Sequence, residues 1–146
     1  MRAANFIFPI TALAVALPQD EGLRKEPICI SDLSIQKSAG GVASISFALT
    51  GDDAENLACT AESPDFPSKV ITCGESKYRF ALYPGRDEEF SVRLYHELGL
   101  GFGFYGQGDL LATCSEDACT SECAMTIIID AEPGENYVTY EGCQRA

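Results

Sequence analysis

The clearest pattern in the chain is an alternation of apolar and polar residues over positions 77–108. It forms three consecutive runs, and the alternate apolar members are Tyr78, Phe80 and Leu82, then Phe90, Val92 and Leu94, then Leu100, Phe102 and Phe104. Successive side chains of a β-strand point to opposite faces, so each run predicts a strand with one buried face. The turn residues Pro84 and Gly85 separate the first two runs. We therefore expect an antiparallel meander at the centre of the fold.

Similar patterns on both sides of the meander predict further strands. Val42–Thr50 alternates cleanly and should form a hairpin with Ser31–Lys37. Shorter strands are expected at Asn56–Ala61, Val70–Cys73, Leu110–Thr113, Ala124–Asp130 and Tyr137–Tyr140. Apolar residues do not repeat at helical spacing over three turns anywhere in the sequence. The fold class predicted is all-β, a single compact antiparallel β-barrel or sandwich stapled by disulfides.

The N-terminus has the three parts of a secretory signal peptide. A short segment with one positive charge precedes the apolar stretch Phe6–Leu17, and small residues at Ala14 and Ala16 suit cleavage after Ala16. The apolar stretch is shorter than the roughly 20 residues of a membrane-spanning helix. We expect a signal peptide over residues 1–16, a flexible leader over 17–27 and the β-barrel domain over 28–146. The protein should therefore be secreted to the extracellular space.

Length and charge narrow the functional classes. The 146 residues suffice for one domain with a sizeable core. The formal net charge of −12 repels phosphate backbones and anionic lipids, which argues against nucleic acid and membranes as partners. The acidic residues are scattered, as on an ordinary solvated surface. A protein partner is the remaining expectation.

Seven cysteines behind a signal peptide predict a disulfide framework with one thiol left over. Cys59 and Cys73 flank a proline-containing loop between two short strands that could be neighbours. One pair is expected among Cys114, Cys119 and Cys123, which lie close together in the sequence. Cys29 and Cys143 lie near opposite ends of the predicted domain. Either they bridge each other, or Cys29 bridges two chains.

A metal site is a poorer explanation of the same cysteines. Cys114, Cys119 and Cys123 could supply three thiolates, but the chain has no CxxC motif and no histidine near them. In an oxidising compartment these thiols should be paired. No metal and no cofactor is predicted.

A second notable stretch is rich in glycine. Gly101–Gly106 matches GxGxxG, but a dinucleotide site needs a helix after it, and none is predicted here. Alternating glycines leave one side of this strand bare, which favours strong curvature of the strand. The bare side could instead receive a flat aromatic ligand or a partner chain. This candidate face consists of Gly99, Gly101, Phe102, Gly103, Phe104 and Tyr105.

No catalytic residue is predicted. His96 is the only histidine, so a Ser-His-Asp or Cys-His mechanism would have to use it. Its neighbours Tyr95 and Glu97 point to the opposite face of a strand, and no GxSxG motif is present. We expect His96 at the surface or at the edge of the core. The many acidic residues single out no carboxylate pair for glycoside hydrolysis.

The chain resembles the Alternaria major-allergen family of small secreted fungal proteins. The resemblance covers roughly Ile30–Ile129 and is carried by the segments ISDLSIQK, ISFALTG, NLACTAE, VITCG, KYRFALYPG and EFSVRLYHELGLGFGFYGQGD. It implies a secreted β-barrel without catalytic residues. Family members include a respiratory allergen and elicitors of plant cell death. The resemblance implies binding to a plant defence protein of the thaumatin-like class, or of a flavonoid-like ligand by an oligomer.

The resemblance also implies two internal disulfides. The first falls on Cys59 and Cys73, and the second joins Cys114 to Cys123. The family allergen forms a dimer bridged by a cysteine near its mature N-terminus, a place comparable to that of Cys29. Two further cysteines depart from the family pattern, at positions 119 and 143, so a bridge between positions 29 and 143 would compete with that dimer.

The function predicted from the sequence is that of a secreted, allergen-like effector or elicitor that binds a host defence protein. A carrier of a small flavonoid-like ligand is the alternative, and a secreted hydrolase ranks lower. A homodimer is compatible with either of the first two.

Overall fold

The computed structural model describes residues 24–132 and 137–143 and shows an all-β protein, as predicted. Its eleven strands are β1 (Lys25–Ser38), β2 (Gly41–Gly51), β3 (Ala54–Glu62), β4 (Ile71–Thr72), β5 (Tyr78–Pro84), β6 (Phe90–Gly99), β7 (Phe102–Asp109), β8 (Thr113–Cys114), β9 (Ala118–Thr120), β10 (Met125–Asp130) and β11 (Thr139–Glu141). Within these residues no helix is long and apolar enough to cross a membrane.

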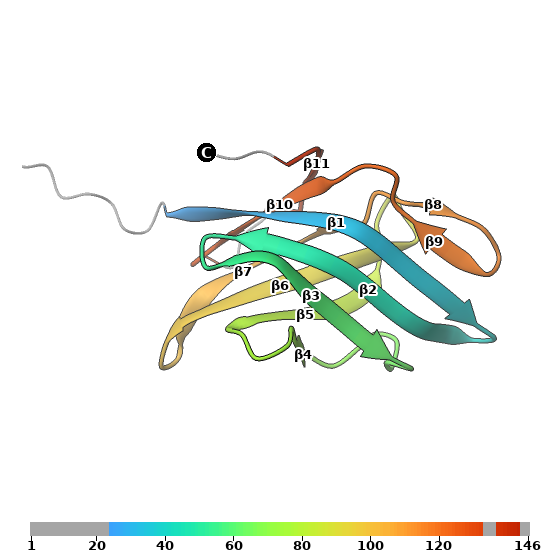
Figure 1. Cartoon of the computed structure of the whole chain (residues 1–146), viewed down its shortest axis with the longest axis horizontal. Coiled ribbons are helices and arrows are strands. Elements are labelled where there is room, and N and C mark those ends of the chain that lie inside the picture. The colour runs from blue at the N-terminus through green and yellow to red at the C-terminus, as the bar shows by residue number, and fades with distance from the viewer. Residues whose placement is uncertain (1–23, 133–136, 144–146) are drawn as a thin grey trace, which may run out of the picture.

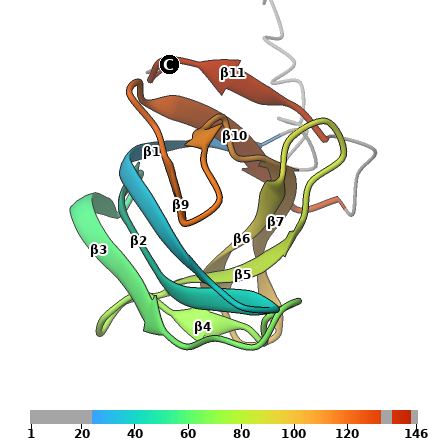
Figure 2. The same cartoon turned by 90° about the vertical axis from the view of Figure 1, so that its right-hand side faces the viewer.

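The strands form one curled antiparallel sheet (Figure 1). Its order is β3-β2-β1-β10-β7-β6-β5-β4, with β11 beside β10 and β9 beside β1 and β8. Figure 2 shows how the curl brings β3 close to β4. The described parts of these two strands share no main-chain ladder, but a disulfide joins Cys59 of β3 to Cys73, the residue directly after β4, across a Cα–Cα distance of 4.4 Å. The sheet is therefore a nearly closed barrel whose seam is fastened by a covalent bond.

The longest strand, β1, pairs with two different strands along one of its edges. It pairs with β10 from Lys25 to Ile30 and with β9 from Ser34 to Gln36. Between these segments the register shifts, and Asp32 adopts a positive φ of 53°. A β-bulge of this kind bends the strand and increases its twist. The bulge therefore marks the point where β1 leaves β10 and meets β9.

The predicted buried face of the meander is largely correct. Along β5 and β6 the six alternate apolar residues are buried, and Phe104 of β7 is 4% exposed. The prediction was wrong for Leu100, which is fully exposed, and for Phe102, which is 56% exposed. The reason is a tight turn between β6 and β7, where Gly101 has a positive φ of 69°. Leu100 lies at this turn, and Phe102 begins the next strand beyond the covered core.

Three predicted boundaries also need correction. Strand β1 begins at Lys25, inside the expected leader, because its first residues pair with β10. A strand was expected at Leu110–Thr113, but Leu110 is a buried loop residue whose N–H donates to the carbonyl of Phe90. No strand was expected between Cys114 and Cys123, but this stretch contains β9. Residues 1–16 and most of the predicted leader lie outside the described residues, so the cleavage site remains a prediction.

Candidate functional site

The outer face of β5, β6 and β7 carries a row of aromatic and charged side chains. Arg79 lies opposite Tyr95, and Tyr95 lies opposite Tyr105, so the three side chains share one face of the sheet. The tyrosine rings stack with their centroids 6.4 Å apart. Arg79 also forms an ion pair with Glu97, with Nη2 and Oε2 3.0 Å apart. Both side chains of this pair are well exposed, so it stabilises the fold little and is free to rearrange.

Beside this row is an open groove with a volume of about 620 Å³. All six residues of the candidate face line it, together with Val70 and the tyrosine pair. Phe102 and Val70 are each more than half exposed, and the space next to Gly99 and Gly101 is empty out to 4 Å. Exposed apolar residues gathered around a concave surface are typical of a binding site. The groove is therefore the candidate functional site.

The glycines of β7 have a second, structural role. A Cβ atom on Gly103 would lie 2.5 Å from the carbonyl oxygen of His96. On Gly106 it would collide with the carbonyl oxygen of Ile128, and on Gly108 with the hydroxyl of Thr139. Glycine at these positions therefore lets β6, β10 and β11 lie close against β7. Sequence analysis did not identify Gly106 and Gly108 as sites where another strand approaches closely, because their neighbours are distant in the sequence.

A buried polar cluster of Glu26, Tyr78 and His96 lies inside the barrel. All three residues are at most 2% exposed. Nδ1 of His96 lies 2.5 Å from Oε1 of Glu26, and the hydroxyl of Tyr78 donates to Oε2 of Glu26 at 2.7 Å. The Tyr78 and His96 rings stack at a centroid distance of 4.0 Å. The expectation that His96 lies at the surface or core edge was therefore wrong.

The turn between β2 and β3 closes over this cluster. A Cβ atom on Gly51 would lie 2.6 Å from Oε2 of Glu26 and 2.7 Å from the hydroxyl of Tyr78, so glycine is needed there. The N–H of Asp53 donates to that hydroxyl at 2.9 Å. Burial raises the pKa of the Tyr78 phenol well above its usual range, which the Asp53 N–H partly opposes. Tyr78 therefore keeps its proton and remains a donor to Glu26.

Within the described residues, the cluster does not pair His96 with a serine or cysteine nucleophile. The polar side chains that contact His96 are those of Glu26, Asp53 and Tyr78, and none of these is a serine or cysteine nucleophile. A signal for the burial of His96 is present in the sequence. It follows Phe90, Val92 and Leu94 at the same two-residue interval. That parity places it on the core face of β6.

A second polar site holds the loop between β5 and β6. The carboxylate of Asp109 accepts the N–H groups of Arg86, Asp87 and Glu88 at 2.9, 2.8 and 3.2 Å. It also accepts the hydroxyl of Tyr137 at 2.5 Å. Burial alone would raise the pKa of Asp109, but these hydrogen bonds outweigh it and hold the pKa below its usual value. The ionised carboxylate of Asp109 therefore holds the loop between β5 and β6 in place.

Replacing Asp109 by asparagine should lower the free energy of unfolding at neutral pH by about 1–3 kcal/mol, because three part-buried hydrogen bonds from main-chain N–H groups lose their charged acceptor. A depressed pKa gives stability that is complete above the unfolded value of about 3.9 and is lost as pH falls through the folded pKa. The deficit of the variant should therefore shrink in acid. Urea unfolding at about pH 7 and about pH 2 would measure this. Asp87→Asn, at an exposed position, is the control, and a pH-independent deficit would contradict the prediction.

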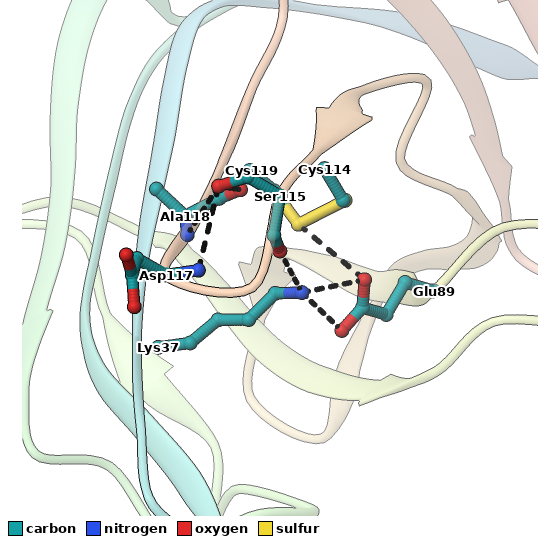
Figure 3. Close-up of polar contacts among 7 residues, drawn as sticks. All are labelled: Lys37, Glu89, Cys114, Ser115, Asp117, Ala118 and Cys119. Carbon is teal, nitrogen blue, oxygen red and sulfur yellow. Dashed lines mark hydrogen bonds and ion pairs between the residues drawn. A yellow bond between two sulfur atoms is a disulfide. The ribbon is translucent and has the colours of Figure 1, made fainter.

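A third cluster of polar side chains joins β1, the loop between β5 and β6, and the hairpin formed by β8 and β9 (Figure 3). Nζ of Lys37 lies 2.6 Å from Oε1 of Glu89 and donates to the carbonyl of Ser115 at 2.7 Å. Glu89, Cys114 and Cys119 bring an oxygen and two sulfurs together, as a metal site would. The two sulfurs are joined in a disulfide, however, and so are not thiolate ligands. The arrangement is a structural ion pair packed beside a disulfide.

The predicted Cys114–Cys123 bridge is wrong, because the structure pairs Cys114 with Cys119. Strands β8 and β9 form a small hairpin in which these two cysteines are directly opposite each other, with a Cα–Cα distance of 4.0 Å. Cys123 lies past the hairpin as an exposed free thiol. The register of the hairpin therefore decides the pairing.

The ends of the described chain are joined by the Cys29–Cys143 disulfide, with a Cα–Cα distance of 5.2 Å. This was one of the two alternatives left open for Cys29. With its sulfur in this bond, Cys29 is not available to bridge two chains. A homodimer would need a different contact, which the native mass measured with and without reductant would reveal.

Comparison with known proteins matches this chain to a protein family over most of its length. The model of the family described as Alternaria alternata allergen 1 matches residues 30–138. A relative named effector protein PevD1, from Verticillium dahliae, is 43% identical over 145 residues, which cover 91% of this chain and 94% of the relative. The protein of the same name from strain VdLs.17 matches equally well. The resemblance inferred from the sequence is confirmed, and the chain belongs to the Alternaria alternata allergen 1 family.

Proposed function

We propose that the protein is a secreted fungal effector that acts by binding a host protein. The observation that carries this proposal is the 43% identity to a protein named as an effector, over nearly the whole of both chains. Effectors act outside the cell that makes them, which agrees with the signal peptide expected at residues 1–16. Three disulfides suit an oxidising extracellular setting.

The groove and its tyrosine row are the surface we assign to the partner. Tyrosine, arginine and phenylalanine are enriched where proteins bind each other, and Phe102 offers an exposed apolar anchor. The net charge of −12 favours a basic protein as the partner. A plant thaumatin-like defence protein is the class that the family resemblance suggests. The binding role of the candidate face is part of this proposal.

Infiltration of the purified mature protein into leaves tests the proposed function. A defence response at micromolar concentration is expected from the native protein. Phe102→Lys should bind a purified thaumatin-like protein at least about tenfold more weakly, because loss of a hot-spot side chain costs upwards of 1–2 kcal/mol. Val138→Lys, at a position that is 50% exposed and outside the groove, is the matched control.

The outcomes separate the function from the surface. No response to the native protein would overturn the effector proposal. A response that Phe102→Lys retains in full would overturn only the assignment of the groove.

A carrier of a planar aromatic ligand is the second candidate, favoured by the shape of the same groove. Its volume lies within the roughly 300–1,000 Å³ typical of small-molecule sites, and Tyr95 and Tyr105 offer stacking surfaces. The chain has no tryptophan, so its fluorescence reports on tyrosine alone. Quenching by a flavonoid that Phe102→Lys weakens would support this role. Unchanged fluorescence would remove it.

A further inference from the structure

Both ring nitrogens of His96 face carboxylate oxygens. Nδ1 lies 2.5 Å from Oε1 of Glu26, and Nε2 lies 3.0 Å from Oδ2 of Asp53. A neutral imidazole has one N–H donor and one acceptor, whereas the imidazolium has two donors. Only the charged ring can therefore be attracted to both carboxylates at once.

The two carboxylates beside the ring differ in how firmly the fold holds them in place. Glu26 is buried, accepts a second hydrogen bond from Tyr78 and has no route to solvent. Asp53 belongs to the turn between β2 and β3, and its side chain is 67% exposed. Although Oδ2 of Asp53 is close, no acceptor completes an aligned hydrogen bond to the buried Nε2. The contact between Asp53 and His96 therefore depends on the charge of the ring.

In the described part of the chain, the other recorded contacts of the ring include no second carboxylate that could replace Asp53. β1 supplies Glu26, β5 supplies the stacked ring of Tyr78, and β7 places the uncharged Phe104 opposite His96. Once Nε2 loses its proton, its lone pair faces the Asp53 carboxylate and the attraction becomes repulsion. Asp53 can turn toward water, whereas Glu26 and Tyr78 cannot.

We propose that His96 and Asp53 form a pH-responsive latch on the turn between β2 and β3. With the ring protonated, Asp53 is drawn inward and the turn is held against the barrel. With the ring neutral, Asp53 is released and the turn loosens. This turn forms one wall of an open polar cavity of about 960 Å³, which Gly51, Asp52 and Asp53 line together with Cys143. The latch therefore controls the shape of this cavity, which shares none of its lining residues with the groove.

Nuclear magnetic resonance on the full mature protein tests the latch without any ligand. The ring signals of His96 and the main-chain amide signal of Asp53 would be followed from about pH 4 to about pH 9, a range that brackets histidine titration. The amide of Asp53 should shift in step with the ring. Above the ring transition, its hydrogen exchange should accelerate beyond the intrinsic effect of pH, because its hydrogen bond to Tyr78 is loosened.

Asp53→Asn is the informative variant, because it neutralises a side chain that is 67% exposed and changes its shape little. It should move the ring transition to lower pH and abolish the coupled shift of the turn. Asp52→Asn, in the same turn but without a contact to the ring, should behave like the native protein. A ring that keeps one charge state throughout would overturn the proposal. So would an Asp53 amide that ignores the transition, or a transition that Asp53→Asn leaves in place.

Discussion

Replacing Glu26 by alanine is expected to lower the free energy of unfolding by about 2–6 kcal/mol, or about 1–3 kcal/mol for each of two buried donors that lose their acceptor. The change leaves Nδ1 of His96 and the hydroxyl of Tyr78 inside the barrel without their acceptor. Buried donors without partners cost their full desolvation free energy. Urea unfolding monitored by circular dichroism at neutral pH would measure the loss.

The control for this prediction is Glu55→Ala, which removes an exposed carboxylate from β3 and should change stability by less than about 0.5 kcal/mol. A loss of under 1 kcal/mol for Glu26→Ala would contradict the role of the cluster. It would show that the two donors find other acceptors.

Removing the Cys29–Cys143 disulfide by serine substitution at both positions is expected to cost about 5 kcal/mol. The two cysteines are 114 positions apart, and the chain-entropy model predicts a cost that rises with loop length. The same model predicts only about 2 kcal/mol for the Cys114–Cys119 bridge, which joins cysteines five positions apart. Unfolding of the two double variants under non-reducing conditions would compare these costs.

The comparison is internal, because both variants lose one disulfide and gain two hydroxyl groups. Equal losses would show that the restriction of the unfolded chain does not set the stability. A larger loss for the short loop would reverse the prediction.

Much of the fold could be predicted from the sequence because its strands are half-buried. Strand β2 differs from the predicted Val42–Thr50 by one residue at each end, since one face meets the core and the other meets solvent. The start of β1 could not be predicted in this way. Glu26 and Pro27 are poor strand formers, and their conformation comes from pairing with β10, about a hundred residues away.

The sequence identified the residues of the candidate face, but it did not show the full shape of the groove that they line. Alternating glycines and aromatics identified the stretch, and the structure places all six residues around one groove. The other lining residues of the groove, such as Arg79 of β5 and Val70 just before β4, come from different parts of the chain and could be placed only with the sheet register. The buried polar cluster could not be predicted from local patterns, because it depends on a contact between Glu26 and His96, which are 70 positions apart.

The bond between Cys29 and Cys143 also makes the described chain almost a closed ring. Digestion by exopeptidases advances from free ends, and local fraying at those ends is usually the first opening of a fold. Here the disulfide ties β1 to the segment after β11, so neither can detach from the fold alone. Exopeptidase digestion from either side should therefore stop at the crosslink. A molecule built this way should persist in protease-rich fluids long after its tails have been removed.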